Sequence, residues 1–146
     1  MRSLFAFFII ASVVAITACT ERVDSTINEG ATKKVMAYFN DSVTPKVIWE
    51  YSDTSDVLAS HFYQNGVLQM KGHIHNGVRD GKWTAWDQKG RMLSTGIYVD
   101  GIENGMWTVW FPSGQIRYQG TFKEGKRSGQ WKFYNEKGKL IKEIDY

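Results

Sequence analysis

Apolar and polar side chains alternate along most of this chain. In residues 82–87, Trp83 and Ala85 fall on one side of an extended segment, and Thr84 and Trp86 fall on the other side. A polar turn at residues 88–91 leads to a second alternating segment at residues 92–99. A period of two predicts β-strands, and the short turn that joins them predicts a hairpin.

This hairpin pattern recurs with a step of 24 residues. Several glycine series and one tryptophan series keep the same step, which indicates a repeat architecture. We therefore expect these glycines and tryptophans to have structural roles. The residues are Gly66, Gly90, Gly114 and Gly138; Gly72, Gly96 and Gly120; Gly77, Gly101 and Gly125; Gly81, Gly105 and Gly129; and Trp83, Trp107 and Trp131.

The step also divides the chain into units. The first unit, residues 35–60, is degenerate, because Val57 and Ala59 stand where later units have glycine and tryptophan. Such an atypical unit is expected at the end of an array, which it caps. The clear units are residues 61–84, 85–108 and 109–132, followed by a partial unit at residues 133–146.

The glycines occur in two settings. Most stand in turns such as Lys89-Gly90 and Asp100-Gly101, where glycine tolerates a positive φ. The series of Gly72 falls in mid-strand, where glycine weakens a sheet unless the missing side chain makes room for something else. We expect a neighbouring tryptophan ring to use that space. Trp107, which has a unit on each side, is expected to be a packed residue of the array.

Together, the G-x-W step after a polar turn, the aromatic pair and the G-x-aromatic step resemble MORN repeats in their bacterial variant form. The resemblance covers residues 35–146. It implies an all-β fold, an elongated single-layer antiparallel sheet that is a meander of β-hairpins. The composition agrees, since 14% of the residues are aromatic and only two are proline.

The N-terminal segment differs from the repeats. Arg2 is followed by about fifteen uncharged, mostly apolar residues, too few for a membrane span and typical of a secretory signal peptide at residues 1–18. Residues 16–19, Ile-Thr-Ala-Cys, resemble a bacterial lipobox. The resemblance implies cleavage between Ala18 and Cys19 and lipidation of Cys19. Because Cys19 is the only cysteine, lipidation also explains how an exported chain avoids a free thiol.

Residues 19–34 are predicted to be the lipidated cysteine and a flexible polar tether. The resemblance therefore predicts a protein of the cell envelope, anchored in the outer membrane rather than the inner one. Without the signal peptide the chain has 17 basic and 15 acidic residues, a balance that argues against a nucleic-acid partner. Residues 109–132 concentrate positive charge that could meet an anionic partner, through Arg117, Lys123, Lys126, Arg127 and Lys132.

The sequence offers no convincing catalytic or metal-binding motif. His73 and His75 share one strand face, but the sister units have Ile97 and Val99 there, so we expect both histidines to face solvent. Residues 120–126 match a phosphate-binding loop only because the repeat glycines create the spacing. We therefore expect no enzyme activity, no cofactor and no metal.

The aromatic residues allow two interpretations. Either the rings pack over glycines and over one another, or one aromatic face stays open as a binding platform. Three functional hypotheses remain: a membrane-anchored module that binds a protein of unknown identity, a surface that binds lipid or glycan, or an antitoxin-like protein that neutralises a toxin. The last rests only on a label often given to the resembled family, and it fits an exported lipoprotein poorly.

Overall fold

The computed structural model describes residues 32–51 and 55–146. The predicted signal peptide, Cys19 and most of the predicted tether lie outside the described residues. Within them no helix is both long enough and apolar enough to cross a membrane. The strands are β1 (Thr32–Tyr38), β2 (Pro45–Tyr51), β3 (Asp56–Phe62), β4 (Leu68–His75), β5 (Val78–Trp86), β6 (Met92–Val99), β7 (Ile102–Glu103), β8 (Gly105–Trp110), β9 (Ile116–Lys123), β10 (Lys126–Tyr134) and β11 (Leu140–Asp145).

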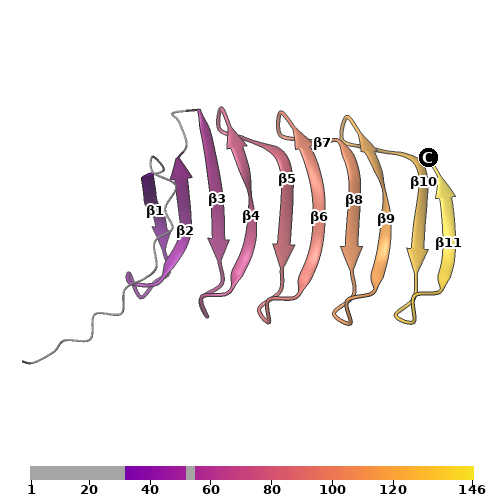
Figure 1. Cartoon of the computed structure of the whole chain (residues 1–146), viewed down its shortest axis with the longest axis horizontal. Coiled ribbons are helices and arrows are strands. Elements are labelled where there is room, and N and C mark those ends of the chain that lie inside the picture. Colours follow the sequence, from indigo (N-terminus) through magenta and orange to yellow (C-terminus); the bar gives the residue numbers. More distant parts are fainter. Residues whose placement is uncertain (1–31, 52–54) are drawn as a thin grey trace, which may run out of the picture.

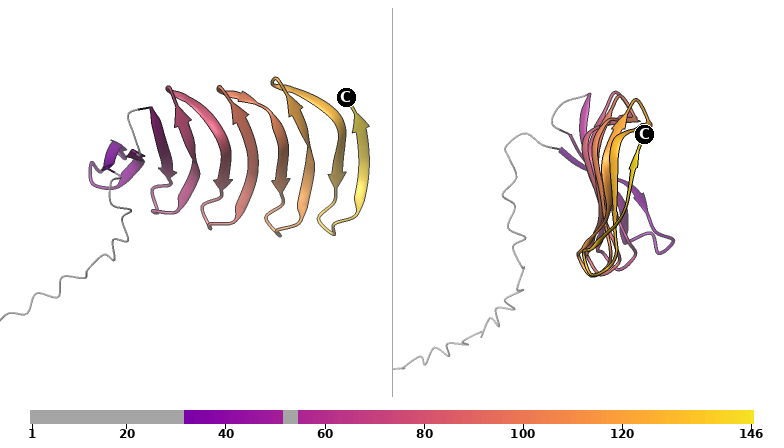
Figure 2. Two further views of the ribbon diagram at one scale, coloured as in Figure 1. Left: turned by 45° about the horizontal axis from the view of Figure 1, so that its top comes forward. Right: turned by 90° about the vertical axis from the view of Figure 1, so that its right-hand side faces the viewer.

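These strands form one open antiparallel sheet in which neighbours in the chain are neighbours in space (Figure 1). The short strand β7 pairs only with β6 and lies off the main path. Seen along its long axis the sheet is one layer thick, and β1 and β2 are turned relative to the later strands (Figure 2). The predicted fold, a single-layer meander of β-hairpins, is confirmed.

The two long edges of the sheet carry different turns. At one edge the turns are two residues long, and both have positive φ, for example 49° at Asp100 and 81° at Gly101. This geometry matches the twist of the flanking strands. At the other edge a longer turn is closed by the side chain of its first residue: Asp87 Oδ1 accepts hydrogen bonds from the backbone N–H groups of Lys89 and Arg91. Asn135 does the same two repeats later.

The sheet begins earlier than its composition indicates. Residues 32–34, whose polar composition suggested a tether, belong to β1, where Thr32 lies opposite Tyr51 and Lys33 opposite Glu50. The Lys33 ammonium also pairs with Glu50 at 3.0 Å. The tether prediction was therefore wrong at this boundary. Charged residues are common on edge strands because they discourage pairing with other chains, so a polar edge strand resembles a linker in sequence.

Tryptophan rings lie over the mid-strand glycines. A Cβ atom built on Gly72, Gly96 or Gly120 would lie 2.3, 1.9 or 2.2 Å from a ring atom of Trp83, Trp107 or Trp131, respectively. Each tryptophan thus folds over a neighbouring strand, where only glycine leaves room. This is the packing that the glycine spacing predicts. Trp131 is 0% exposed and Trp83 4% exposed, although residues 32–51 and 55–146 form only one sheet.

Trp107 departs from this pattern. The indole N–H groups of Trp83 and Trp131 donate to the carbonyls of His73 and Thr121, at 2.9 and 3.1 Å. In the central unit the corresponding carbonyl, that of Ile97, instead accepts a hydrogen bond from the Asn104 N–H at 2.9 Å. The Trp107 ring is turned so that its six-membered ring lies over Gly96, and it is only half-buried.

The cover above the rings differs in the same way. Arg79 lies over the Trp83 ring at 4.4 Å and Arg127 over the Trp131 ring at 4.6 Å. The central unit has Glu103 at this repeat position, so it lacks the arginine that covers the other two rings. The strand is also interrupted here, because β7 ends at Glu103 and β8 begins only at Gly105. The central unit is therefore the least regular of the three.

This difference predicts unequal stability losses. Trp83→Ala should lower the free energy of unfolding by about 3–5 kcal/mol, because it empties a buried site. Trp107→Ala should cost less than Trp83→Ala, and His73→Ala should stay within about 0.5 kcal/mol of wild type. Urea unfolding of the three variants measures these differences. Trp83 and Trp107 both have neighbouring strands on each side, so they differ mainly in burial. Equal losses of unfolding free energy at the two positions would contradict the expectation that the more buried ring stabilises the fold more.

Candidate binding surfaces

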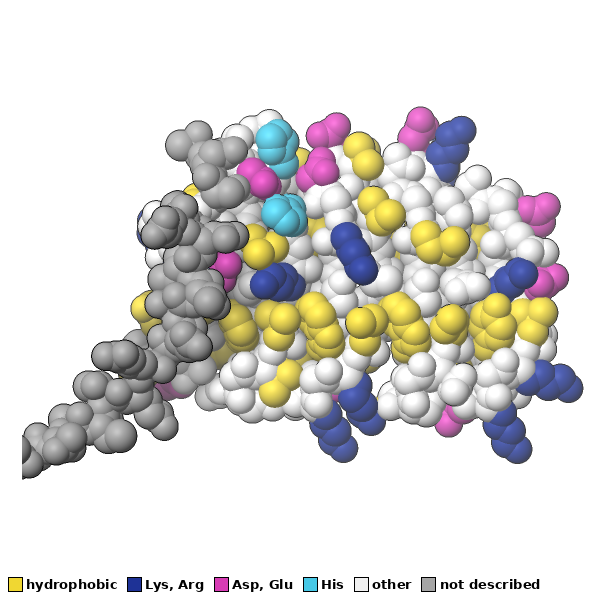
Figure 3. Space-filling model, viewed as in Figure 1, with side chains coloured by type: hydrophobic (Ala, Val, Ile, Leu, Met, Phe, Trp, Pro, Cys, Tyr) yellow, Lys and Arg dark blue, Asp and Glu magenta, His cyan; other side chains and the backbone are white. Residues whose placement is uncertain are grey.

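One face of the sheet carries an unbroken row of hydrophobic side chains along its length (Figure 3). We call this row the apolar stripe. It consists of the last residue before and the first residue after each of the four long turns between β3 and β11, which are cross-strand partners and so share a face. Met92 and Leu140 are 44% and 42% exposed, and the others are half-buried. The pairs are Phe62 with Leu68, Trp86 with Met92, Trp110 with Ile116, and Tyr134 with Leu140.

A repeated β-bulge places these residues. The register shifts by one residue just before each pair, for example between Ala85 and Trp86 and between Val109 and Trp110. A bulge changes which side the next residues face, so the apolar residues at both ends of the turn come to the same side. Simple alternation along each strand does not reveal this arrangement.

Basic residues follow the same long edge of the sheet, next to the apolar stripe. Lys89, Arg91, Lys137 and Lys139 stand exposed in the long turns, and dark-blue side chains mark this edge in Figure 3. Arg91 is held by Asp87, with nitrogen and oxygen 2.6 Å apart. The hydrogen bond from the Arg91 side chain keeps the pKa of Asp87 below its ordinary value, and backbone N–H groups add to this effect.

The opposite face, which we call the aromatic face, is covered by its own rings. Trp107 lies 5.7 Å from Tyr98 and 5.6 Å from Phe122, measured between ring centroids. Phe122 in turn lies 5.0 Å from Trp131, edge to face. Of the two interpretations of the aromatic residues, ring packing therefore describes most of this face.

Comparison with known families gives a match at the C-terminal end of the chain. Residues 103–124 and 127–146 match the family model described as "MORN repeat variant". The C-terminal strands are therefore similar to MORN-type repeats. The earlier units repeat their glycine and tryptophan positions at the same step of 24 residues. No curated protein matches the chain. A MORN repeat indicates a module for binding or interaction.

The sheet separates the basic residues that the sequence grouped together. Lys123 and Lys126 are direct partners at one long edge, whereas Arg117 lies over Phe111 near the other edge. Arg127 lies on the aromatic face, above Trp131, and Lys132 pairs with Glu143 at 3.7 Å. Of the five residues, the structure brings together only Lys123 and Lys126.

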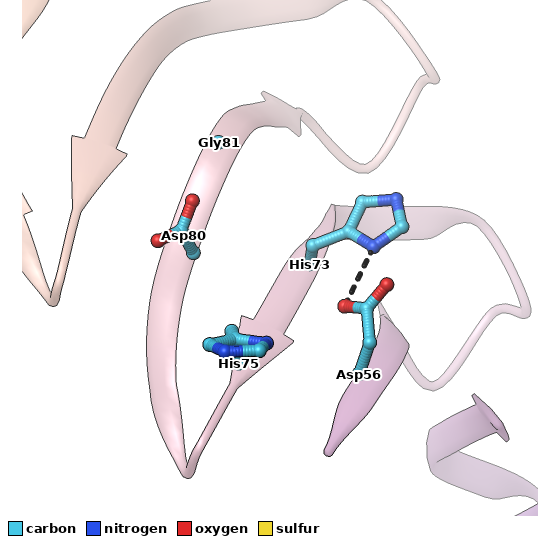
Figure 4. Close-up of a pocket in the computed structure, with 5 residues that line it drawn as sticks. All are labelled: Asp56, His73, His75, Asp80 and Gly81. Carbon is cyan, nitrogen blue, oxygen red and sulfur yellow. Dashed lines mark hydrogen bonds and ion pairs between the residues drawn. The ribbon is translucent and has the colours of Figure 1, made fainter. Parts of the chain in front are cut away.

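The histidines of β4 lie in a shallow hollow with two aspartates (Figure 4). His73 and His75 are exposed, and His73 Nδ1 lies 3.1 Å from Asp56 Oδ1. Asp80, the cross-strand partner of His73, completes the group. Within residues 32–51 and 55–146, no cluster of three or more histidine, cysteine or acidic residues has the geometry to hold a metal ion.

His61 has a different environment, which sequence reasoning missed. It lies on the aromatic face, where its ring centroid is 6.4 Å from that of Trp83. Burial lowers the pKa of His61 below its ordinary value, and the positive charges of Arg79 and Lys46 lower it further. The folded protein therefore favours the neutral ring. The sister position in the next unit is Ala85, so the repeat pattern gave no signal for it.

This shift predicts a pH dependence of stability. Because the pKa of His61 is lower in the folded state, the unfolded chain binds more protons as the pH falls below about 6.5. The free energy of unfolding should therefore decrease between pH 7 and pH 5. His61→Phe keeps a ring against Trp83 without a titrating group, so it should lose less stability over this range than wild type. Urea unfolding at several pH values tests this, and identical pH profiles would show that His61 does not contribute.

Proposed function

We propose that this protein is a non-catalytic, lipid-anchored module of the bacterial cell envelope that binds a protein partner through the apolar stripe. The observation that carries the proposal is the stripe itself. Phe62, Trp86, Trp110 and Tyr134 recur in it at the four long turns between β3 and β11, and the row is visible on the surface in Figure 3. Water contact with a row of large apolar side chains costs free energy, which a complementary surface would recover.

The stripe suits a protein surface in its chemistry. Aromatic residues and methionine are enriched in protein interfaces, and basic residues at the rim remain solvated. Lys89 and Lys137 provide such a rim beside Trp86 and Tyr134. Large aromatic side chains also carry much of the binding energy in known interfaces. We therefore expect a partner with an apolar ridge bordered by acidic residues.

The proposed anchor brings this surface close to the membrane. Cys19 would carry the lipid, and the twelve residues up to β1 could reach at most about 45 Å when extended. Two or more acyl chains hold a protein stably without help from its folded domain. The sheet is therefore free to serve a partner in the same compartment.

The same stripe supports a second candidate, the binding of an anionic lipid surface. A straight apolar row with Trp86, Trp110 and Tyr134 beside a basic edge is the arrangement of interfacial membrane contacts. The two candidates differ in their salt dependence, because binding to anionic headgroups weakens as salt screens the charges.

Cys19→Ser should abolish lipidation, because serine cannot form the thioether that carries diacylglycerol. The variant should keep its signal peptide or be misprocessed, so its size on a gel should differ from that of the mature wild-type protein. Metabolic labelling with a radioactive fatty acid, followed by gel electrophoresis, measures both effects. Label on the Cys19→Ser protein would contradict the anchor.

A matched pair of variants tests the stripe. Met92→Glu puts a charge into the stripe, whereas Ile97→Glu puts the same charge on the same strand and face outside it, at a similar exposure of 40%. Cross-linked partners recovered from solubilised envelopes should be lost with Met92→Glu and kept with Ile97→Glu. Equal recovery with both variants, or no partner with wild type, would contradict protein binding through the stripe.

A lipid assay separates the second candidate. A soluble version without residues 1–19 is mixed with vesicles that contain anionic phospholipid or only zwitterionic phospholipid, and flotation is measured at low and high salt. Flotation that requires anionic lipid and disappears in high salt would assign the stripe to a membrane surface.

A further inference from the structure

The aromatic face has a recess near the middle of the sheet. It has a volume of about 90 Å³ and is walled by the rings of Trp83, Tyr98 and Trp107, by Met70 and by Arg79. Ala85 and Ser94 form its floor as direct cross-strand partners. Trp83 folds away over β4 and Trp107 lies over β6, so the space between the two rings stays open above β5.

The sister units explain why the recess occurs here. The next unit has Val109 and Tyr118 as the corresponding cross-strand pair. Tyr118 packs against Trp131 and Phe133, with ring centroids 6.2 and 5.9 Å apart. The recess therefore arises from two small residues at positions where the same backbone accepts larger ones. Because it departs from the repeat, the repeat architecture does not require it.

Arg79 gives the recess a charge. Its guanidinium group donates to Tyr98 Oη and to Met70 Sδ, both at 3.2 Å, and lies over Trp83. Arginine has five N–H donors, so three remain for another acceptor. The ion pairs among the described residues do not include Arg79. The group is thus held in place by its neighbours, with donors available.

We infer that this recess is a second binding site, on the face opposite the apolar stripe, for an extended peptide segment that has an aliphatic and an acidic residue. The volume equals about three water molecules at roughly 30 Å³ each, the size of a branched aliphatic side chain. The carboxylate pairs with Arg79, whose planar fork suits bidentate recognition of that group. Trp83 and Tyr98 are only 4% and 8% exposed, so they serve as walls and offer no open ring for a sugar to stack on.

The geometry of an extended chain sets the spacing of the two residues. Side chains at positions i and i+2 of a strand point to the same side, whereas neighbours point to opposite sides. A peptide that lies along the sheet therefore presents its aliphatic and acidic side chains together only when one residue separates them. The matching probe is acetyl-Leu-Ser-Glu-amide.

Peptide titrations of the full-length protein in detergent, followed by NMR of the tryptophan indole N–H signals, test the site. The Leu-Ser-Glu peptide should bind at least about ten times more tightly than Leu-Ser-Gln, which lacks the charge, and than Ala-Ser-Glu, which lacks the larger aliphatic group. Equal affinity for the three peptides, or no saturation below about 10 mM, would overturn the inference.

Variants built from the sister unit complete the test. Ala85→Val with Ser94→Tyr copies the pair found in the next unit, so it should fold and lose peptide binding about tenfold or more. The Arg79→Gln protein should no longer prefer the Leu-Ser-Glu peptide over Leu-Ser-Gln. The Arg127→Gln protein, which lacks an equivalent stacked arginine outside the recess, should still prefer Leu-Ser-Glu. If Arg79→Gln fails to fold, the variant with Ala85→Val and Ser94→Tyr still tests the site. Unchanged peptide binding by that variant would overturn the inference that the recess binds the peptide.

Met92→Glu on the apolar stripe should leave peptide binding unchanged. This control separates the two faces. Loss of the partner with unchanged peptide binding concerns the stripe alone, and loss of peptide binding with the partner kept concerns the recess alone.

Discussion

The contact between each tryptophan ring and the glycine of a neighbouring strand determines the rest of this structure. A single-layer sheet has no second layer to remove apolar side chains from water. Trp83 and Trp131 are nevertheless buried, because each ring lies on backbone that has no side chain. A methyl group at Gly72 or Gly120 would collide with that ring. Burial in this sheet therefore comes from rings that cross from strand to strand, and each unit depends on the one beside it.

The same contact is missing at both ends of the described sheet. Trp131 lies opposite Ile144 on β11, at the repeat position where β6 and β9 have glycine. The branched side chain of Ile144 leaves no bare backbone of the kind on which the tryptophan rings lie at Gly72 and Gly120. At the other end Ala59 takes the place of tryptophan and lies opposite Gly72. Within the described residues, the glycine–tryptophan pairing thus operates between β4 and β10.

The period and the chemistry of glycine were enough to predict the hairpins, the single layer, and the packing of Trp83 and its sister rings over glycines. Features that depend on neighbouring strands were missed. The bulges turn Trp86 and Met92 to one face, and alternation within a strand does not show this. The basic residues near the C-terminal end are close in sequence but divide between faces and edges, as Arg127 and Lys132 do. Residues 32–34 pair as an edge strand despite their polar composition.

The two faces differ in what they leave for other molecules. The apolar stripe repeats at every long turn, so its chemistry is nearly uniform along the sheet, and uniform surfaces discriminate poorly between partners. The aromatic face is filled by its own rings except where Ala85 and Ser94 replace larger residues and Arg79 has donors to spare. In a repeat protein the repeated residues hold the fold together, so they cannot vary much without loss of stability. Residues that break the repeat are freer to vary, and Ala85 and Ser94, which stand where the next unit has Val109 and Tyr118, are of this kind.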